Sequence, residues 1–162
     1  MEKVNQSAVE AKKFINAGKI RRNDLSILTP VGSELKIIFN PCNIEGKFDT
    51  DLHKLLSKRW TKPKDEYKMW FVTRQNFKLN ESIMASVQSD VWVYNTLLFK
   101  EDKFQGDLNK VLKDLATKAK YDKGSVHISD LVFDQLPELN EEMLKKHLLD
   151  EGVNVFLYKD KK

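Results

Sequence analysis

Glycine is scarce in this chain. Only six of the 162 residues are glycine, roughly half of the usual share of about 7%. A loop that grips a phosphate with main-chain amides needs glycines, because the backbone must approach the ligand closely and adopt conformations that other residues avoid. The low count therefore argues against a fold or an activity built on several glycine-rich loops.

Cysteine and long apolar runs are also scarce. The one cysteine, Cys42, excludes an intramolecular disulfide and any zinc site built from several cysteines. No stretch approaches the roughly 18 apolar residues of a membrane-spanning helix, and residues 1–13 lack the apolar core of a signal peptide. We therefore expect a soluble, cytoplasmic protein with no membrane partner, no metal and no cofactor.

The residues that are present favour one folded domain. Hydrophobic residues make up 41% of the chain, with three Trp, four Tyr and nine Phe, which is enough for a core and argues against disorder. The net charge of +4 is mild, so a nucleic-acid partner is not favoured, while a small anionic ligand is compatible with it. The length predicts a single domain over 1–162. The composition, rich in Lys and Asn, suits a phage or another AT-rich genome.

The hydrophobic pattern alternates between strands and helices. Residues 1–22 form an expected N-terminal helical extension, with a break between residues 18 and 24. Caps and apolar periodicity predict helices over 7–17, 49–60, 107–121 and 140–150, and strands over 25–29, 35–39, 67–73, 82–88, 90–99, 125–129 and 153–158. This order predicts a three-layer α/β/α fold with a mixed, mostly parallel sheet. Ligands of such sheets bind beyond the carboxyl ends of the strands, here after residues 39, 99 and 129.

The loop after the second of these strands carries the first candidate site. Asn40, Asn43, Gly46 and Lys47 lie between a buried strand and the start of a helix. Asparagine can donate to and accept from ribose hydroxyls, and a helix N-terminus suits phosphate. The alternative is an Asn/Pro/Gly turn that happens to precede a capped helix.

At these residues the chain resembles the macro domain, the fold that binds ADP-ribose. The resemblance is carried by LKIIFNPCNIEGKFDTDLHKLLSKRW and continues through SIMASVQSDVWVYNTLLFKED, SVHIS and VNVFLY, covering roughly residues 25–158. It implies that Asn43 contacts the distal ribose and assists catalysis. It also implies that Gly46 and Asn40 belong to the ligand loop, that Asn95 ends the central strand, and that His127 is structural.

The chain departs from the family pattern in three places. Bulky and acidic residues occupy 47–51, where the family has small ones. Residues 130–137 contain no glycine, although the second phosphate loop of the family is glycine-rich. The Gly-Asp pair that holds the adenine amino group is matched at best by Gly32 and Ser33. In this divergent loop Asp130 and Asp134 are candidate catalytic acids, with solvated loop acids as the alternative.

Three other groups of residues have a functional and a structural interpretation. The run Asp49, Asp51 and His53 could bind a metal or transfer protons, or could simply begin a helix. Cys42 could be a nucleophile, but a buried structural thiol explains it as well. A basic run could contact a phosphate backbone or form a solvated helix face; it comprises Lys54, Lys58, Arg59, Lys62 and Lys64.

The resemblance and these residues leave three functions open. The first is recognition of ADP-ribose or a related nucleotide, with ADP-ribosyl or ADP-ribose phosphate hydrolase activity as its catalytic form. The second is a macro fold with a degenerate pocket, acting as a protein-interaction or inhibitory module with a host protein as partner. The third is a single-stranded nucleic-acid binder, whose bases would stack on the aromatic side chains.

Overall fold

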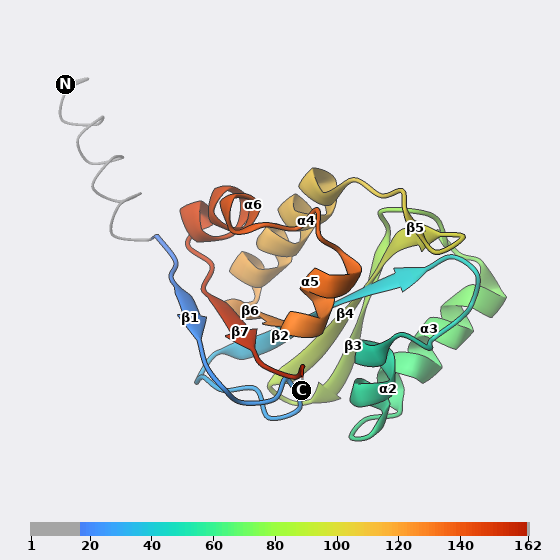
Figure 1. Ribbon diagram of the computed structural model, residues 1–162, viewed down its shortest axis with the longest axis horizontal. Coiled ribbons are helices and arrows are strands. Elements are labelled where there is room, and N and C mark those ends of the chain that lie inside the picture. Colours follow the sequence, from blue (N-terminus) through green and yellow to red (C-terminus); the bar gives the residue numbers. More distant parts are fainter. Residues whose placement is uncertain (1–16, 162) are drawn as a thin grey trace.

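The computed structural model describes residues 17–161 and shows a sheet of seven strands (Figure 1). The strands are β1 (Ile20–Arg22), β2 (Leu35–Asn43), β3 (Ser82–Gln88), β4 (Val91–Lys100), β5 (Lys103–Phe104), β6 (Gly124–Ser129) and β7 (Val155–Tyr158). Their spatial order is β1-β7-β6-β2-β4-β3, and β5 pairs with β4. The five strands from β1 to β4 in this order run parallel, whereas β3 and β5 run antiparallel to β4.

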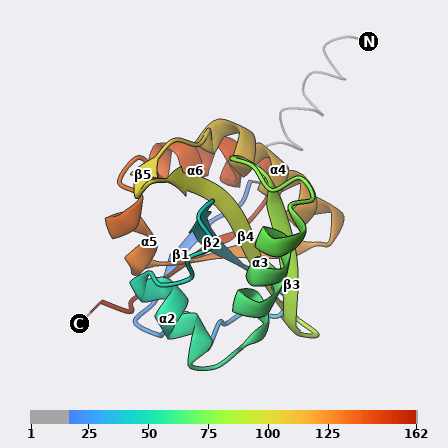
Figure 2. The ribbon, with the colours of Figure 1, turned by 90° about the vertical axis from the view of Figure 1, so that its right-hand side faces the viewer.

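Helices cover both faces of this sheet (Figure 2). One layer contains α2 (Asp51–Ser57) and α3 (Lys62–Thr73), and the other contains α4 (Leu108–Tyr121) and α6 (Glu141–His147). A short helix, α5 (Asp130–Gln135), directly follows β6, and a 3-10 turn, Leu149–Glu151, precedes β7. The three-layer α/β/α architecture and the mixed, mostly parallel sheet predicted from the sequence are confirmed.

Local signals in the sequence explain the best-defined elements. Asp107 caps α4 by accepting from the main-chain N–H of Lys110, and six apolar residues of this helix are buried against the sheet. β2 is buried along nearly its whole length because parallel strands on both sides and helices on both faces enclose it. The described part of the chain contains no helix long and apolar enough to cross a membrane.

The strand expected over 67–73 is wrong, because these residues belong to α3. Pro63 lies in the first turn of α3, where its missing N–H costs nothing, so it favours the start of this helix, whereas α2 has already ended at Ser57. Pro63, Tyr67 and Trp70 are the buried residues of α3, spaced four and three apart. The β-branched and aromatic residues of this segment suggested a strand, but the helical spacing of its buried side chains decided its structure.

The first strand of the sheet also differs from the expectation. Residues 25–29 form turns, and it is Ile20–Arg22 that pairs with β7, so the end of the expected helical extension is a strand. The helix expected over 7–17 lies, except for its last residue, outside the described part of the chain. Residues 130–135, expected as a loop, form α5, whose first turn is capped by Ser129.

Candidate functional site

The carboxyl ends of the parallel strands meet at one edge of the sheet, and the loops that follow them are linked. The main-chain N–H of Ile44, after β2, donates to the carbonyl of Phe99 at 3.1 Å. The N–H of Glu101, after β4, donates to the carboxylate of Glu45 at 3.1 Å. The loops after β2 and β4 therefore form one structural unit.

Asn43 organises the loop that follows β2. Its Oδ1 accepts from the main-chain N–H groups of Glu45 at 2.9 Å and Lys47 at 3.2 Å, and its Nδ2 donates to the carbonyl of Lys47 at 2.8 Å. The side chain is buried. The Oδ1 and one N–H of this amide are thus engaged within the loop, while the side chain of Lys47 is exposed.

Helix α3 holds the same loop from outside. The hydroxyl of Tyr67 lies 2.8 Å from both the carbonyl oxygen and Oδ1 of Asn43, and burial raises the pKa of this phenol above its usual range. The ammonium of Lys68 donates to the carbonyl of Gly46. Gly46 has a φ of 80°, and a Cβ added there would lie 2.8 Å from the ring of Phe71. Glycine is therefore required at this position by both conformation and space.

Asn40 and Asn95 lie below this loop, within the sheet. Nδ2 of Asn40 donates to Oδ1 of Asn95 at 2.7 Å, and Nδ2 of Asn95 donates to the carbonyl of Pro63 at 3.0 Å. Neither residue has any exposed surface. The structure thus places these two amides beneath the loop, where they join β2, β4 and the start of α3.

Cys42 has a histidine neighbour that its sequence surroundings did not show. Its Sγ lies 3.7 Å from Nε2 of His53. That Nε2 lies 3.0 Å from the carbonyl of Pro41, so it carries the proton and donates there, while Nδ1 accepts from the N–H of Thr50. Burial raises the pKa of the Cys42 thiol and lowers the pKa of His53 to about 4. Both groups are neutral, and neither ring nitrogen is free to deprotonate the thiol.

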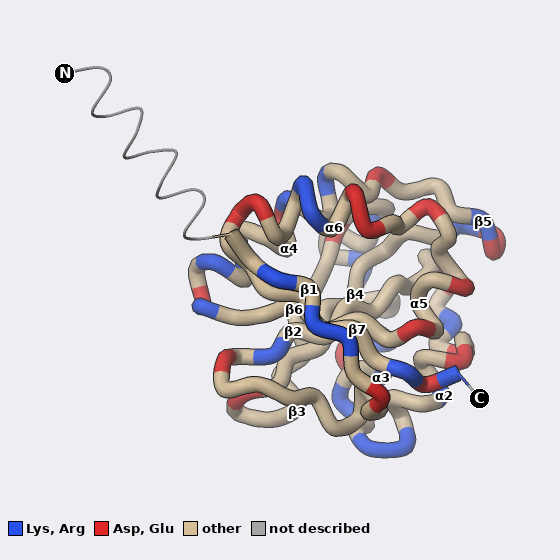
Figure 3. The backbone as a smooth tube through the Cα atoms, turned by 60° about the vertical axis from the view of Figure 1, so that its left-hand side comes forward, with Lys and Arg blue, Asp and Glu red and all other residues tan. Residues whose placement is uncertain are grey.

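The two aspartates of α5 contact the last described residues. Oδ1 of Asp130 accepts from the main-chain N–H groups of Asp160 at 2.8 Å and Lys161 at 3.1 Å. The carboxylate of Asp134 pairs with the ammonium of Lys161 at 2.8 Å, and this pairing raises the pKa of Lys161. Figure 3 shows acidic and basic residues side by side around the C-terminus, α2 and α5.

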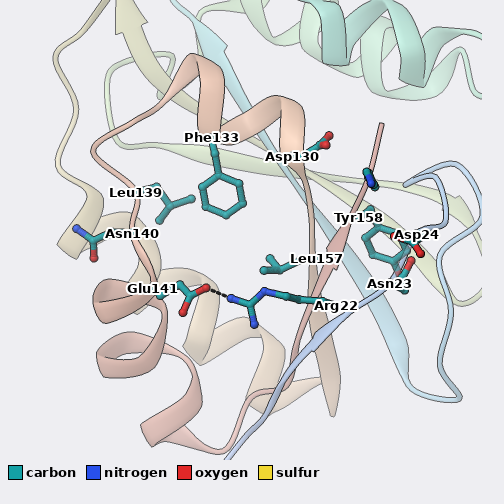
Figure 4. A pocket seen from close by; sticks show the side chains of 11 residues that line it. Arg22, Asn23, Asp24, Asp130, Phe133, Leu139, Asn140, Glu141, Leu157 and Tyr158 are labelled. Carbon is teal, nitrogen blue, oxygen red and sulfur yellow. Dashed lines mark ion pairs between the residues drawn. The ribbon is translucent and has the colours of Figure 1, made fainter. Parts of the chain in front are cut away.

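Hollows lie on both sides of α5. One, of about 530 Å³, lies between α5, α6 and the ends of β1 and β7 (Figure 4). The other lies between α2 and α5 and consists of a groove of about 480 Å³ and an adjoining pocket of about 300 Å³, which share Asp51, Leu131 and Asp134. We call the first the β1–α5 pocket and the second the α2–α5 groove.

Asn23 and Asp24 follow β1 directly and line the β1–α5 pocket. Nδ2 of Asn23 is buried and has no hydrogen-bond partner among the described residues. Gly32, the residue suggested by the family resemblance, lies instead against the ring of Phe156. Sequence reasoning missed Asn23 and Asp24 because it placed the first strand after them, at 25–29.

Comparison with solved structures decides the fold. A macrodomain protein from Streptomyces coelicolor is similar over 88% of this chain and 99% of its own, with a TM-score of 0.78 and 21% identity. The chain has the macro-domain fold. The macrodomain of Mycobacterium tuberculosis DarG is also similar, with a TM-score of 0.66 and 16% identity over 89% of this chain and 99% of its own.

A third similar structure is Thermosipho africanus DarTG in complex with ADP-ribose, with a TM-score of 0.61 and 10% identity over 79% of this chain and 39% of that one. No family model and no curated protein matches the chain. Identities of this size show a shared macro-domain fold and not a shared activity.

The chain has α5 where the family resemblance implies a glycine-rich loop. Ser129 caps a helix there, and its hydroxyl accepts from the main-chain N–H of Leu131 at 3.2 Å, so this N–H is already engaged. Within residues 17–161, no group of three His, Cys, Asp or Glu side chains is placed to hold a metal ion.

Proposed function

We propose that this macro domain binds a nucleotide of the ADP-ribose type at the carboxyl edge of its sheet, with the base in the β1–α5 pocket. The observation that carries the proposal is the buried, unpartnered Nδ2 of Asn23 beside the carboxylate of Asp24. A buried donor without a partner is costly unless a ligand or water satisfies it. Together these two side chains offer one donor and one acceptor, the groups that the edge of a purine base requires.

The walls of the pocket support the same ligand class. Phe133, Leu139 and Leu157 line it with apolar surface, and Figure 4 shows Phe133 and Leu139 on one side and Asn23 and Asp24 on the other. An aromatic ring and branched aliphatic groups suit the flat faces of a base. The volume of about 530 Å³ lies within the usual range for ligand pockets, about 300–1,000 Å³.

The proposal is one of binding and does not extend to hydrolysis. Asn43, the catalytic candidate, has its Oδ1 and one N–H engaged by the loop and by Tyr67. Asp130 and Asp134 are engaged by the C-terminal residues. A general base or acid must reach the reacting atoms with a free proton site, and both oxygens of Asp130 and one oxygen of Asp134 are already engaged.

Calorimetric titration with ADP-ribose tests the proposal. We expect heat of binding with the full chain, and at least a tenfold weaker affinity for Asp24→Asn, because a hydrogen bond to a charged group contributes roughly 1.5–3 kcal/mol. Asp122→Asn is the matched control, since Asp122 follows α4 at the opposite edge of the sheet. The absence of heat at millimolar ADP-ribose would refute the proposal for this ligand.

A second candidate function is supported by the outer face of α3. Met69 and Val72 are adjacent on this helix and are 62% and 74% exposed. Neighbouring exposed apolar side chains are typical of a protein contact, as expected of a macro fold acting as an interaction module. A pull-down from the native host should then retain a stoichiometric partner with the wild type and with Tyr121→Glu, and lose it with Val72→Glu.

A further inference from the structure

Three donors converge on one carboxylate near the C-terminus. The hydroxyls of Ser26 and Ser129 each donate to Asp160, at 2.6 Å to Oδ1 and Oδ2 respectively. The main-chain N–H of Ile27 lies 3.3 Å from both oxygens. We call these donors, contributed by Ser26, Ile27 and Ser129, the anion cradle.

The cradle is organised for an anion by its own surroundings. Each of the two hydroxyl oxygens already accepts a main-chain N–H: that of Leu28 for Ser26 at 3.1 Å, and that of Leu131 for Ser129 at 3.2 Å. The proton of each hydroxyl is then available to donate to the group bound in the cradle, which must be a hydrogen-bond acceptor. Ser129 has no exposed surface, so one wall of the cradle is buried within the protein.

The occupant, Asp160, belongs to a short segment that α5 also contacts. Just after β7, the main-chain N–H of Lys159 donates to the carbonyl of Leu25. Beyond it, Asp130 accepts from the main chain of Asp160 and Lys161, and Lys161 pairs with Asp134. We call residues 159–161 the C-terminal strap.

The strap lies between the two hollows. Tyr158 and Lys159 line the β1–α5 pocket, whereas Asp160 and Lys161 line the α2–α5 groove. A ligand with its base in the first hollow and its other groups in the second must therefore pass the position of the strap. The carboxylate of Asp160 occupies the anion cradle at this position.

We propose that Asp160 is an internal substitute for a phosphate group, and that a phosphate-bearing ligand binds by displacing the C-terminal strap from the anion cradle. Carboxylate and phosphate oxygens accept the same hydroxyl and amide donors, so the exchange preserves each bond of the cradle. Because the closed state excludes the ligand, the affinity of the full chain is reduced by the fraction of molecules that are open. The identity of the ligand as a nucleotide rests on the proposed function, whereas the cradle and the strap do not.

Inorganic pyrophosphate is the probe that tests this inference without a nucleotide. We expect Asp160→Asn to bind it at least tenfold more tightly than the wild type in calorimetry, because the neutral amide places a donor against the donors of the cradle. The amide resonance of Ile27 should shift on binding. Asp122→Asn makes the same change in net charge far from the cradle and should bind like the wild type.

A third variant tests whether the gain in affinity comes from the donors of the cradle or only from the loss of a negative charge. In Asp160→Asn combined with Ser129→Ala, the gain in affinity should disappear, because one donor of the cradle is lost. Lys161→Ala, which leaves the cradle intact and loosens the strap, should give a smaller gain in the same direction and serves if Asp160→Asn fails to fold. Equal affinities of wild type and Asp160→Asn, or a gain that survives Ser129→Ala, would overturn the inference.

The same variants distinguish this inference from the proposed function. If Asp160→Asn gains affinity for pyrophosphate but neither it nor the wild type binds ADP-ribose, displacement of the strap by phosphate is supported and the nucleotide proposal fails. If the wild type binds ADP-ribose and Asp160→Asn binds both probes no better, the nucleotide proposal stands and the strap is refuted.

Discussion

Asn40 and Asn95 face each other across β2 and β4, with Nδ2 of Asn40 donating to Oδ1 of Asn95 at 2.7 Å. The other end of the Asn95 amide donates to the carbonyl of Pro63, in the first turn of α3. Four residues further along α3, Tyr67 contacts Asn43. The asparagine pair therefore helps to set the position of the helix that holds the loop after β2.

We predict that Asn95→Ala lowers the free energy of unfolding by about 1–3 kcal/mol, the cost of leaving buried polar groups unpaired. The carbonyl of Pro63 would lose the Nδ2 donor of Asn95, the Nδ2 of Asn40 would keep only its long contact with Sγ of Cys42, and Oδ1 of Asn40 already has no partner among the described residues. Urea unfolding of Asn40→Ala, Asn95→Ala and the double variant gives the coupling energy. We expect roughly 0.5 kcal/mol or more; strictly additive effects would show that the pair is not a unit.

Gly46→Ala should destabilise the protein more than Gly32→Ala. Both residues have positive φ, 80° and 119°, so both substitutions introduce backbone strain of about 1 kcal/mol or more. Only Gly46 would also bring its Cβ to 2.8 Å from the ring of Phe71; at Gly32 the nearest atom lies 3.5 Å away. The difference between the two variants in thermal unfolding midpoint measures the cost of the contact between the added Cβ and Phe71. Equal shifts in midpoint would contradict a steric requirement for glycine at position 46.

Elements with local signals were predictable from the sequence. The cap Asp107 and the apolar stripe of α4 lie within one helix, and residues 82–88 match β3 at both ends. Helix α3 was missed because YKMWFVT has the residue types of a strand, and its helical spacing becomes evident only when Pro63 is taken as the start. Helix α5 was missed because its six residues show no clear period and its ends depend on Ser129 and on the C-terminal residues.

The candidate site was predictable in position more than in detail. The loop after β2 lies at the carboxyl edge, as expected for a sheet of parallel strands. That the amide of Asn43 is engaged by Tyr67 could not be inferred, because the two residues are 24 positions apart. The same applies to Ser129 and Asp160, which are 31 positions apart. Contacts of this kind depend on how the elements pack, and a single sequence carries no signal for them.

Tyr67→Phe should release Asn43 without disturbing the core. The phenol ring stays buried, so the loss is that of one hydrogen bond, about 0.5–1.5 kcal/mol of unfolding free energy. We expect faster hydrogen exchange at the amides of Glu45 and Lys47, which donate to Asn43. The amide of Lys110, which caps α4 through Asp107, should exchange at its wild-type rate; an equal acceleration there would indicate general destabilisation.

Acid should destabilise this protein through His53 and His127, two of its three buried histidines. His127 lies between Ser125 and Tyr158, with Nε2 and Nδ1 each 2.7 Å from a hydroxyl oxygen. Burial, with the charge of Lys36 as a smaller cause, lowers its pKa to about 3. Burial likewise lowers the pKa of His53 to about 4. In the unfolded chain both titrate near 6.5, so below that pH the unfolded state binds more protons than the folded one.

Stability should therefore be independent of these groups above about pH 7 and should fall as the pH drops from 6.5 towards 4, by up to about 1.4 kcal/mol per pH unit for each histidine. Urea unfolding between pH 4.5 and 8 measures this slope. In His127→Gln the slope should decrease by the contribution of one proton, although the variant is less stable at every pH, since Ser125 and Tyr158 lose a partner. An unchanged slope, or an imidazole resonance of His127 that titrates near pH 6.5 in the folded protein, would show that this side chain is accessible to protons and that the cluster around Tyr158 is open to water.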